Sequence, residues 1–320
     1  MGNSYIAMNY KCNHDCICCP LSTYDRLHAP LDYKILKQQI LNIAKNNKNL
    51  SFTISGGEPT IHENFFGLLN LLSKINADIT ILSNASSCSD NDFVKRIIDS
   101  LAYDYNLDKL HYVTAIHSTD YKVHDKITQT NGSLKETLRG LNNLNHNNIG
   151  ITIKHIMNKL TCESMPNTFE DLANSFSNNV EFQFCSMDYT GRCKKHIEEL
   201  FIKFSELQPY LEKTIDLFEL NKNNIGRELS IFESPLCMVD PYYWKYFIPH
   251  NEILSSYIAP NDESENNISN NVLSQCNTNY ENCKNCDVKE LCGGVWESAY
   301  NIGKNDTEYL RPVKVLKKKY

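Results

Sequence analysis

Residues 12–19 of the chain have the sequence Cys12-Asn13-His14-Asp15-Cys16-Ile17-Cys18-Cys19, which places four cysteines within eight positions. Three of them, Cys12, Cys16 and Cys19, follow the spacing Cys-x3-Cys-x2-Cys. A loop of this length can hold one face of a cubic iron–sulfur cluster. A [4Fe–4S] cluster normally takes four cysteine ligands, so a group of three leaves one iron free to bind a small molecule.

Two other roles for these cysteines have to be weighed. A disulfide is disfavoured because four cysteines so close together, two of them adjacent, do not suit the geometry of a bridge. A structural zinc site usually joins a Cys-x2-Cys pair to a second pair farther along the chain, rather than to a cysteine four residues upstream. The spacing therefore favours the cluster, with zinc as the open alternative.

The spacing resembles the cluster-binding loop of the radical SAM (radical S-adenosylmethionine) enzymes. The resemblance implies that Cys12, Cys16 and Cys19 bind a [4Fe–4S] cluster whose open iron holds S-adenosylmethionine. It also implies reductive cleavage of that molecule to a 5′-deoxyadenosyl radical, which takes a hydrogen atom from the substrate. The chain departs from the family at Cys18, where an aromatic residue is usual. Cys18 could compete for the iron or fill space as a small apolar side chain.

The composition narrows the class of protein. The chain has 320 residues, 41% hydrophobic and 22% charged, with a formal net charge of −6. Nucleic-acid binding needs a basic face, so we expect no nucleic-acid partner. The sequence contains neither a signal peptide nor an apolar run of the roughly 20 residues that a bilayer requires. We therefore expect a cytoplasmic protein that does not associate with a membrane. Its 13 cysteines are clustered, which favours metal or cluster binding.

Strands and helices are expected to alternate over the first 200 residues, which predicts an α/β fold with a parallel sheet. Six such units form a partial (β/α)6 barrel of the TIM type, with chemistry at the carboxyl ends of its strands. We expect this barrel over residues 1–200 and a smaller cysteine-rich extension over 201–320. Expected strands are 4–10, 50–54, 79–82, 110–116, 149–157, 180–185 and 229–233; expected helices are 31–46, 63–75, 90–101, 133–145, 165–177 and 198–220. Residues 124–132 are interpreted as a loop with a glycine turn, and 260–282 as an irregular segment.

Three further motifs follow expected strands. Gly56-Gly57-Glu58-Pro59 matches the family's GGEP turn, so the resemblance implies that Glu58 and the backbone of Gly56 and Gly57 receive the amino group of S-adenosylmethionine. Ser83 and Asn84 stand where relatives hold the ribose hydroxyls. Arg192, in a Gly-Arg pair after the sixth strand, resembles a residue that could bind the methionine carboxylate. Each motif has an alternative interpretation. The Gly-Gly-Glu motif could be a plain turn, Ser83 and Asn84 could be ordinary polar residues at a strand end, and Arg192 could be a surface arginine.

A second group of cysteines lies in the extension, with the spacing Cys283-x2-Cys286-x5-Cys292. It resembles the start of the SPASM pattern, an auxiliary-cluster domain of peptide maturases. The pattern is broken at Trp296, where another cysteine is expected, so we expect one auxiliary [4Fe–4S] cluster, as in the shorter Twitch variant. Cys237 is the expected fourth ligand and Cys276 the second candidate, and zinc suits this group as well. With Pro235-Leu236-Cys237, Tyr300, Gly303 and Glu308, the region resembles maturases of the His-Xaa-Ser peptide type.

The resemblance implies a radical SAM enzyme that modifies a ribosomally made peptide by a crosslink, an epimerisation or an oxidation. The alternatives are oxidation or rearrangement of a small metabolite, and a non-catalytic iron–sulfur or zinc protein. We expect an electron donor such as flavodoxin or ferredoxin. Because the cysteine loop starts at residue 12, we expect the leader of a peptide substrate to be held by a separate protein or by the extension. His117 could face the substrate, but no residue is assigned a catalytic role.

Overall fold

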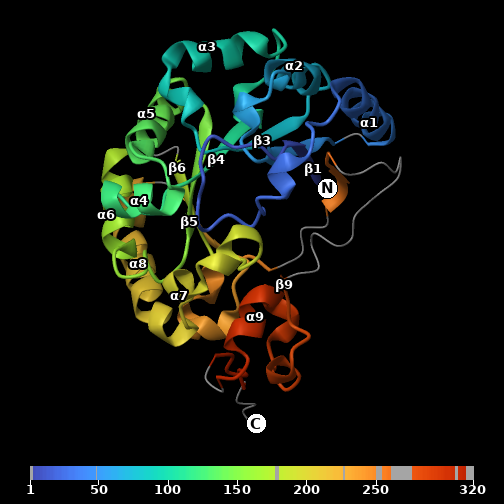
Figure 1. The fold of residues 1–320 in the computed structure, drawn as a ribbon. Coiled ribbons are helices and arrows are strands. Elements are labelled where there is room, and N and C mark those ends of the chain that lie inside the picture. Colours follow the sequence, from blue (N-terminus) through green and yellow to red (C-terminus); the bar gives the residue numbers. More distant parts are fainter. Residues whose placement is uncertain are drawn as a thin grey trace.

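The computed structural model describes residues 3–47, 49–176, 180–225, 228–249, 254–260, 276–306 and 309–314. An eight-stranded parallel sheet forms its centre, with helices along one side (Figure 1). The strands are β1 (Asn3–Asn9), β2 (Ser51–Gly56), β3 (Asp78–Leu82), β4 (Leu110–Ala115), β5 (Gly150–Ile156), β6 (Val180–Cys185), β7 (Leu229–Phe232) and β8 (Leu254–Ile258).

The strand order β7-β6-β5-β4-β3-β2-β1-β8 confirms the expected α/β fold of the partial-barrel type. All neighbouring strands are parallel, so the carboxyl ends of β1 to β7 meet at one rim. The sheet is wider than six strands, because β7 continues it beyond β6 and β8 pairs with β1. The strand β8 was not predicted, because its sequence Leu-Ser-Ser-Tyr-Ile has little hydrophobic character.

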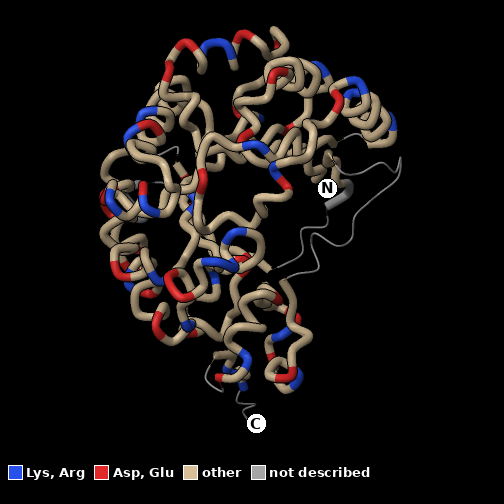
Figure 2. Tube along the Cα trace, in the orientation of Figure 1, with Lys and Arg blue, Asp and Glu red and all other residues tan. Residues whose placement is uncertain are grey.

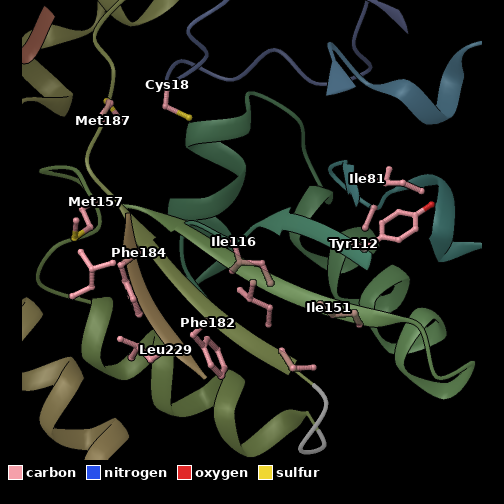
Figure 3. Close-up of a cluster of buried hydrophobic side chains, with 14 of the residues drawn as sticks. Cys18, Ile81, Tyr112, Ile116, Ile151, Met157, Phe182, Phe184, Met187 and Leu229 are labelled. Atoms are coloured by element: carbon pink, nitrogen blue, oxygen red, sulfur yellow. The ribbon is translucent and has the colours of Figure 1, made fainter. Parts of the chain in front are cut away.

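The helices cover one face of the sheet and bury its apolar side chains. Ile151, Phe182 and Leu229 gather on this face (Figure 3). Burying each of them stabilises the fold by about 1.5–3 kcal/mol. The helices of the first two-thirds of the chain are α1 (Tyr33–Asn46), α2 (Phe65–Lys74), α3 (Asn91–Ser100), α4 (Tyr121–Thr128), α5 (Ser133–His146) and α6 (Met165–Ser175).

Helix α4 corrects one expectation, since residues 124–132 were interpreted as a loop. The Asp120 side chain caps the helix by accepting a hydrogen bond from the backbone N–H of Lys122, and Gln129 ends it in a left-handed conformation. The expected helix at 198–220 is divided into α7 (Ile197–Leu200) and α8 (Phe204–Ile225). Among the described residues, no helix combines the length and apolar character needed to cross a bilayer.

The last described part of the chain lies beside α7 at one end of the molecule (Figure 1). It contains the antiparallel pair β9 (Cys276–Asn277) and β10 (Val295–Trp296), followed by α9 (Glu297–Gly303).

Most of the expected irregular segment and Glu308 lie outside the described residues. Basic and acidic residues alternate along the outer helices, with no large region of one sign in this view (Figure 2). The division of the chain near residue 200 stays a prediction.

Candidate active site

The cysteine loop, the Gly-Gly-Glu turn and Ser83-Asn84 follow β1, β2 and β3 at the same rim of the sheet. Backbone hydrogen bonds join the first two motifs. The N–H of Gly57 donates to the carbonyl of Asn9 at 2.7 Å, and the N–H of Glu58 donates to that of Lys11 at 2.8 Å. Hydrogen bonds from the Ser83 hydroxyl and the Asn84 N–H to the Glu58 carboxylate join the third motif, so the three motifs form one structural unit.

The turn requires glycine at two positions. Gly56 has φ of +112°, a conformation that side-chain-bearing residues rarely adopt. A Cβ atom on Gly57 would lie 2.0 Å from the carbonyl oxygen of Lys11 and 2.6 Å from that of Tyr10. Both obstacles are backbone atoms and cannot rotate away. The glycines thus allow the turn to lie directly against the start of the cysteine loop.

Replacing Gly57 by alanine is expected to destabilise the protein by about 1–3 kcal/mol, the usual cost of forcing extra atoms into a packed site. Urea unfolding of the metal-free protein measures this change. Gly67→Ala is the matched control, because Gly67 lies within α2 and its nearest obstacle is the Tyr33 side chain. Alanine favours a helix interior, so the control should be neutral or slightly stabilising. Equal stability of the two variants would contradict this account of the turn.

Glu58 is the central acidic group of the site and is only 1% exposed. Its Oε1 accepts hydrogen bonds from the backbone N–H and the hydroxyl of Thr60, at 3.0 and 2.5 Å, and from the Ser83 hydroxyl at 2.8 Å. Its Oε2 accepts from the backbone N–H of Asn84 at 2.8 Å. Burial raises the pKa of Glu58, and the hydrogen bonds only partly offset that effect. Because a carboxylate has about four acceptor positions, Oε2 retains capacity for one further donor.

Asn84 connects the end of β3 to the cysteine loop. Its side-chain amide donates to Oδ1 of Asn13 at 2.8 Å, and the Asn13 amide donates to the Ser86 hydroxyl at 2.8 Å. Ser83 is buried, with its hydroxyl directed at Glu58. Both residues therefore lie at the rim where they were expected, engaged in hydrogen bonds within the protein.

In the cysteine loop, Cys16 lies near enough to both Cys12 and Cys19 to affect their ionisation. Cys12, Cys16 and Cys19 are each partly exposed and form no disulfide. Burial raises the pKa of Cys12 to about 12, with a further contribution from the nearby Cys16. Burial and Cys16 likewise raise the pKa of Cys19. A loop with three cysteines, in which Cys16 neighbours the other two, supplies the donor set of a cluster, whose iron would favour the thiolate form.

Arg192 lies against the cysteine loop rather than free at the rim. Its guanidinium forms an ion pair with the Asp15 carboxylate and donates to the Asp15 carbonyl at 2.7 Å. The same carboxylate accepts from Arg26 at 2.8 Å. Binding a methionine carboxylate would require Arg192 to share or leave this pair. The Asp15 side chain is 59% exposed, so the pairs contribute at most about 1 kcal/mol each.

A group of buried histidines beneath the cysteine loop was missed by the sequence analysis. His14, His117, His124 and His155 are each less than 5% exposed. They come from the cysteine loop, the segment after β4, helix α4 and strand β5, and β4 and β5 are neighbours in the sheet. Among the described atoms, one ring nitrogen each of His14, His117 and His155 has no hydrogen-bond partner. Burial lowers the pKa of His117 well below its usual value, so its ring is neutral.

Four thiols of the extension line a second site. Cys237, Cys283, Cys286 and Cys292 lie around one pocket, and the other three thiols contribute to the raised pKa of Cys237. Cys276 is outside this lining, and its thiol donates to a backbone carbonyl at 3.2 Å. Within the described residues, no three His, Cys, Asp or Glu side chains have the spacing for a single metal ion.

Comparison with known proteins gives a match to the family model of the Radical SAM superfamily over residues 6–172. No curated protein matches the sequence. The structure is similar to Streptococcus suis SuiB bound to precursor peptide SuiA, with a TM-score of 0.63 and 17% identity over 98% of this chain and 75% of SuiB. Two other SuiB structures match over 49% and 47% of their length.

Two further solved structures share the fold. One is anSMEcpe with bound AdoMet (S-adenosylmethionine) and Cp18Cys peptide, at a TM-score of 0.54 and 16% identity over 71% of this chain and 62% of that protein. The other is the coproporphyrinogen III oxidase HemN from Escherichia coli, at a TM-score of 0.50 and 15% identity over 68% of this chain and 52% of HemN. At these identities the likeness establishes the fold alone.

Proposed function

Because the chain belongs to the radical SAM superfamily, we propose that it is an enzyme that cleaves S-adenosylmethionine reductively and abstracts a hydrogen atom from its substrate. When bound, a reduced [4Fe–4S] cluster supplies the electron that breaks a C–S bond of S-adenosylmethionine, giving methionine and a 5′-deoxyadenosyl radical. We also propose flavodoxin or ferredoxin as the class of electron donor.

The observation that carries the proposal is the hydrogen-bonded unit formed at the ends of β1, β2 and β3. It places Glu58 between the cysteine loop and Ser83-Asn84. In this arrangement Cys12, Cys16 and Cys19 would hold the cluster. Glu58 Oε2 and the backbone of Gly56 and Gly57 would accept the amino group of S-adenosylmethionine.

At the edge of the site, Asn84 and Arg192 already have partners within the protein. Ser83 and Asn84 would bind the ribose hydroxyls after exchanging their present partners. Arg192 would bind the methionine carboxylate only after sharing its pair with Asp15. Both remain proposals. A decrease in affinity for S-adenosylmethionine in Asn84→Ala or Arg192→Ala, with unchanged iron content, would support the corresponding assignment.

Anaerobic reconstitution with dithionite and S-adenosylmethionine tests the reaction. The wild-type protein should release 5′-deoxyadenosine, and a variant with alanine at Cys12, Cys16 and Cys19 should release none above background. Cys162→Ala is the control, because this buried thiol lies between β5 and α6 and its charged neighbours are Glu163 and Glu206 rather than residues of the three motifs. Equal product from wild type and the triple variant would favour a non-catalytic iron–sulfur or zinc protein.

We propose a ribosomally made peptide as the substrate. Support comes from the shared fold of SuiB and anSMEcpe, whose structures are named for bound peptides. A small metabolite is the second candidate, favoured by the shared fold of HemN, named as an oxidase of coproporphyrinogen III. A short reading frame beside the gene would supply the peptide to test. A change in its mass that depends on S-adenosylmethionine supports the first candidate, and product formation stimulated only by a sugar or nucleoside supports the second.

We further propose an auxiliary [4Fe–4S] cluster held by Cys237, Cys283, Cys286 and Cys292, as in the SPASM and Twitch type. The pocket that these thiols share supports Cys237 over Cys276 as the fourth ligand. Iron, sulfide and zinc should be counted in the variant that lacks the three loop cysteines. About four irons per chain would support one remaining cluster, and zinc without iron would contradict it.

A further inference from the structure

A buried contact beneath the cysteine loop concerns Cys18. This residue is only 5% exposed and belongs to the hydrophobic core (Figure 3), whereas the three proposed cluster ligands are partly exposed. Its sulfur lies 3.8 Å from Nε2 of His117. The contact therefore joins the cysteine loop to a side chain at the end of β4.

The backbone of the loop directs Cys18 toward this contact. The N–H of Asp15 donates to the carbonyl of Thr128 at 3.0 Å, and the N–H of Ile17 donates to the carbonyl of Ile127 at 2.8 Å. Both acceptors lie in the last turn of α4. The residue that follows Ile17 is thus held close to the helix, and its side chain enters the space beneath the loop.

His117 is itself fixed in place. It is 2% exposed, and its backbone N–H donates to Nδ1 of His124 at 3.3 Å. The two rings lie in contact, with centroids 5.4 Å apart. A neutral imidazole carries one N–H and one acceptor nitrogen. Its Nε2 can therefore donate to the sulfur in one tautomer or accept from the S–H in the other. Among the described atoms, Nδ1 of His117 has no partner, and the hydrogen-bonding contact of the ring is that of Nε2 with Cys18.

The sulfur of Cys18 is also close to a proposed cluster ligand. Cys18 directly precedes the proposed ligand Cys19 and stands two residues after the proposed ligand Cys16. A fourth thiol so near the cluster is a potential ligand for its open iron. A [4Fe–4S] cluster with four cysteine ligands would have no iron free for S-adenosylmethionine.

We propose that His117 is a positioning residue that retains the Cys18 sulfur in the core and so keeps the fourth iron open. This inference rests on the proposed function, because it assumes that Cys12, Cys16 and Cys19 hold a cluster. If Cys18 occupied the open iron in nine molecules of ten, the apparent affinity for S-adenosylmethionine would fall about tenfold.

The decisive experiment compares His117→Leu, Cys18→Ala and the double variant. Leucine fills much of the imidazole volume and removes both ring nitrogens. The reduced, reconstituted proteins are titrated with S-adenosylmethionine and followed by electron paramagnetic resonance, which reports ligand binding at the iron. The His117→Leu variant should bind about tenfold more weakly than wild type, and the double variant should bind as tightly as Cys18→Ala. Wild-type affinity in His117→Leu, or no recovery in the double variant, would overturn the proposal.

A second measurement does not need a cluster. In the metal-free protein, iodoacetamide should modify Cys18 more slowly than Cys12, as followed by mass spectrometry. His117→Leu should increase the rate at Cys18 severalfold while the rate at Cys12, an internal control for unfolding, stays the same. Equal rates at Cys18 in wild type and variant would overturn the retaining contact. A wild-type protein that binds no cluster but passes this test would instead overturn the proposed function.

Discussion

Glu58→Ala is expected to destabilise the folded protein by about 3–5 kcal/mol, because it leaves one buried and one partly buried backbone N–H group without acceptors. These N–H groups belong to Thr60 and Asn84, and both now donate to the Glu58 carboxylate. The hydroxyls of Thr60 and Ser83 also lose their acceptor. Each unpaired buried donor costs about 1–3 kcal/mol, so the backbone groups alone account for most of the loss.

Glu58→Gln keeps the shape of the side chain and should lose less stability than Glu58→Ala. An amide at this position can accept the three hydrogen bonds now made to Oε1, but its NH2 group faces the N–H of Asn84. We expect about half the destabilisation of the alanine variant. Urea unfolding of the metal-free proteins measures both changes, and Glu63→Ala is the control, because Glu63 is exposed on the same turn. A Glu58→Ala variant as stable as the control would contradict the central role of this carboxylate.

The fold could be predicted largely from the alternation of hydrophobic patterns. The first six strands lie within one or two residues of their predicted positions, because each is a short apolar run bounded by polar residues. Helix α4 was missed because only Tyr121, Val123 and Ile127 are apolar within its eight residues, and Tyr121 is exposed. Its capping residue Asp120 was the available signal.

The candidate site was predictable to the level of strand ends and no further. Parallel strands bring their carboxyl ends to one rim, so the convergence of the cysteine loop, Glu58 and Ser83 followed from the fold class. The partners of each side chain did not follow, because hydrogen bonds depend on loop geometry that has no periodic signal. The pairing of Arg192 with Asp15 and the contact of Cys18 with His117 are examples, each joining residues about 100 or more positions apart.

Acidification from pH 6.5 to pH 4 is expected to destabilise the protein steeply, because buried histidines must become protonated on unfolding. Burial lowers the pKa of His124 and of His155 to about 4, against 6.5 in an exposed histidine. The unfolded chain therefore binds more protons than the folded one in this window, and the free energy of unfolding rises with pH. The stabilisation is complete above pH 6.5 and is lost as pH falls toward 4, by up to about 3 kcal/mol for each residue.

His155→Asn isolates one of these contributions. His155 Nδ1 lies 3.0 Å from the carbonyl of Ile116, and an asparagine amide can donate to the same carbonyl without titrating. Urea unfolding of the metal-free protein at pH 7, 5.5 and 4.5 should show a weaker pH dependence in this variant. His146→Asn is the control, because His146 is exposed on α5 and its replacement should leave the slope unchanged.

Glu58 acts in the opposite direction and must be separated from the histidines. Its pKa is raised in the folded protein, so its contribution to stability is present at low pH and is lost as pH rises through that value. The histidines outnumber it, because His62, His111 and His117 also have lowered pKa values. The free energy of unfolding should therefore still rise with pH. Combining Glu58→Gln with His155→Asn tests this balance: the first change should steepen the pH dependence and the second should reduce it. A slope that is flat in wild type, or unchanged in His155→Asn, would mean that the buried rings are not neutral.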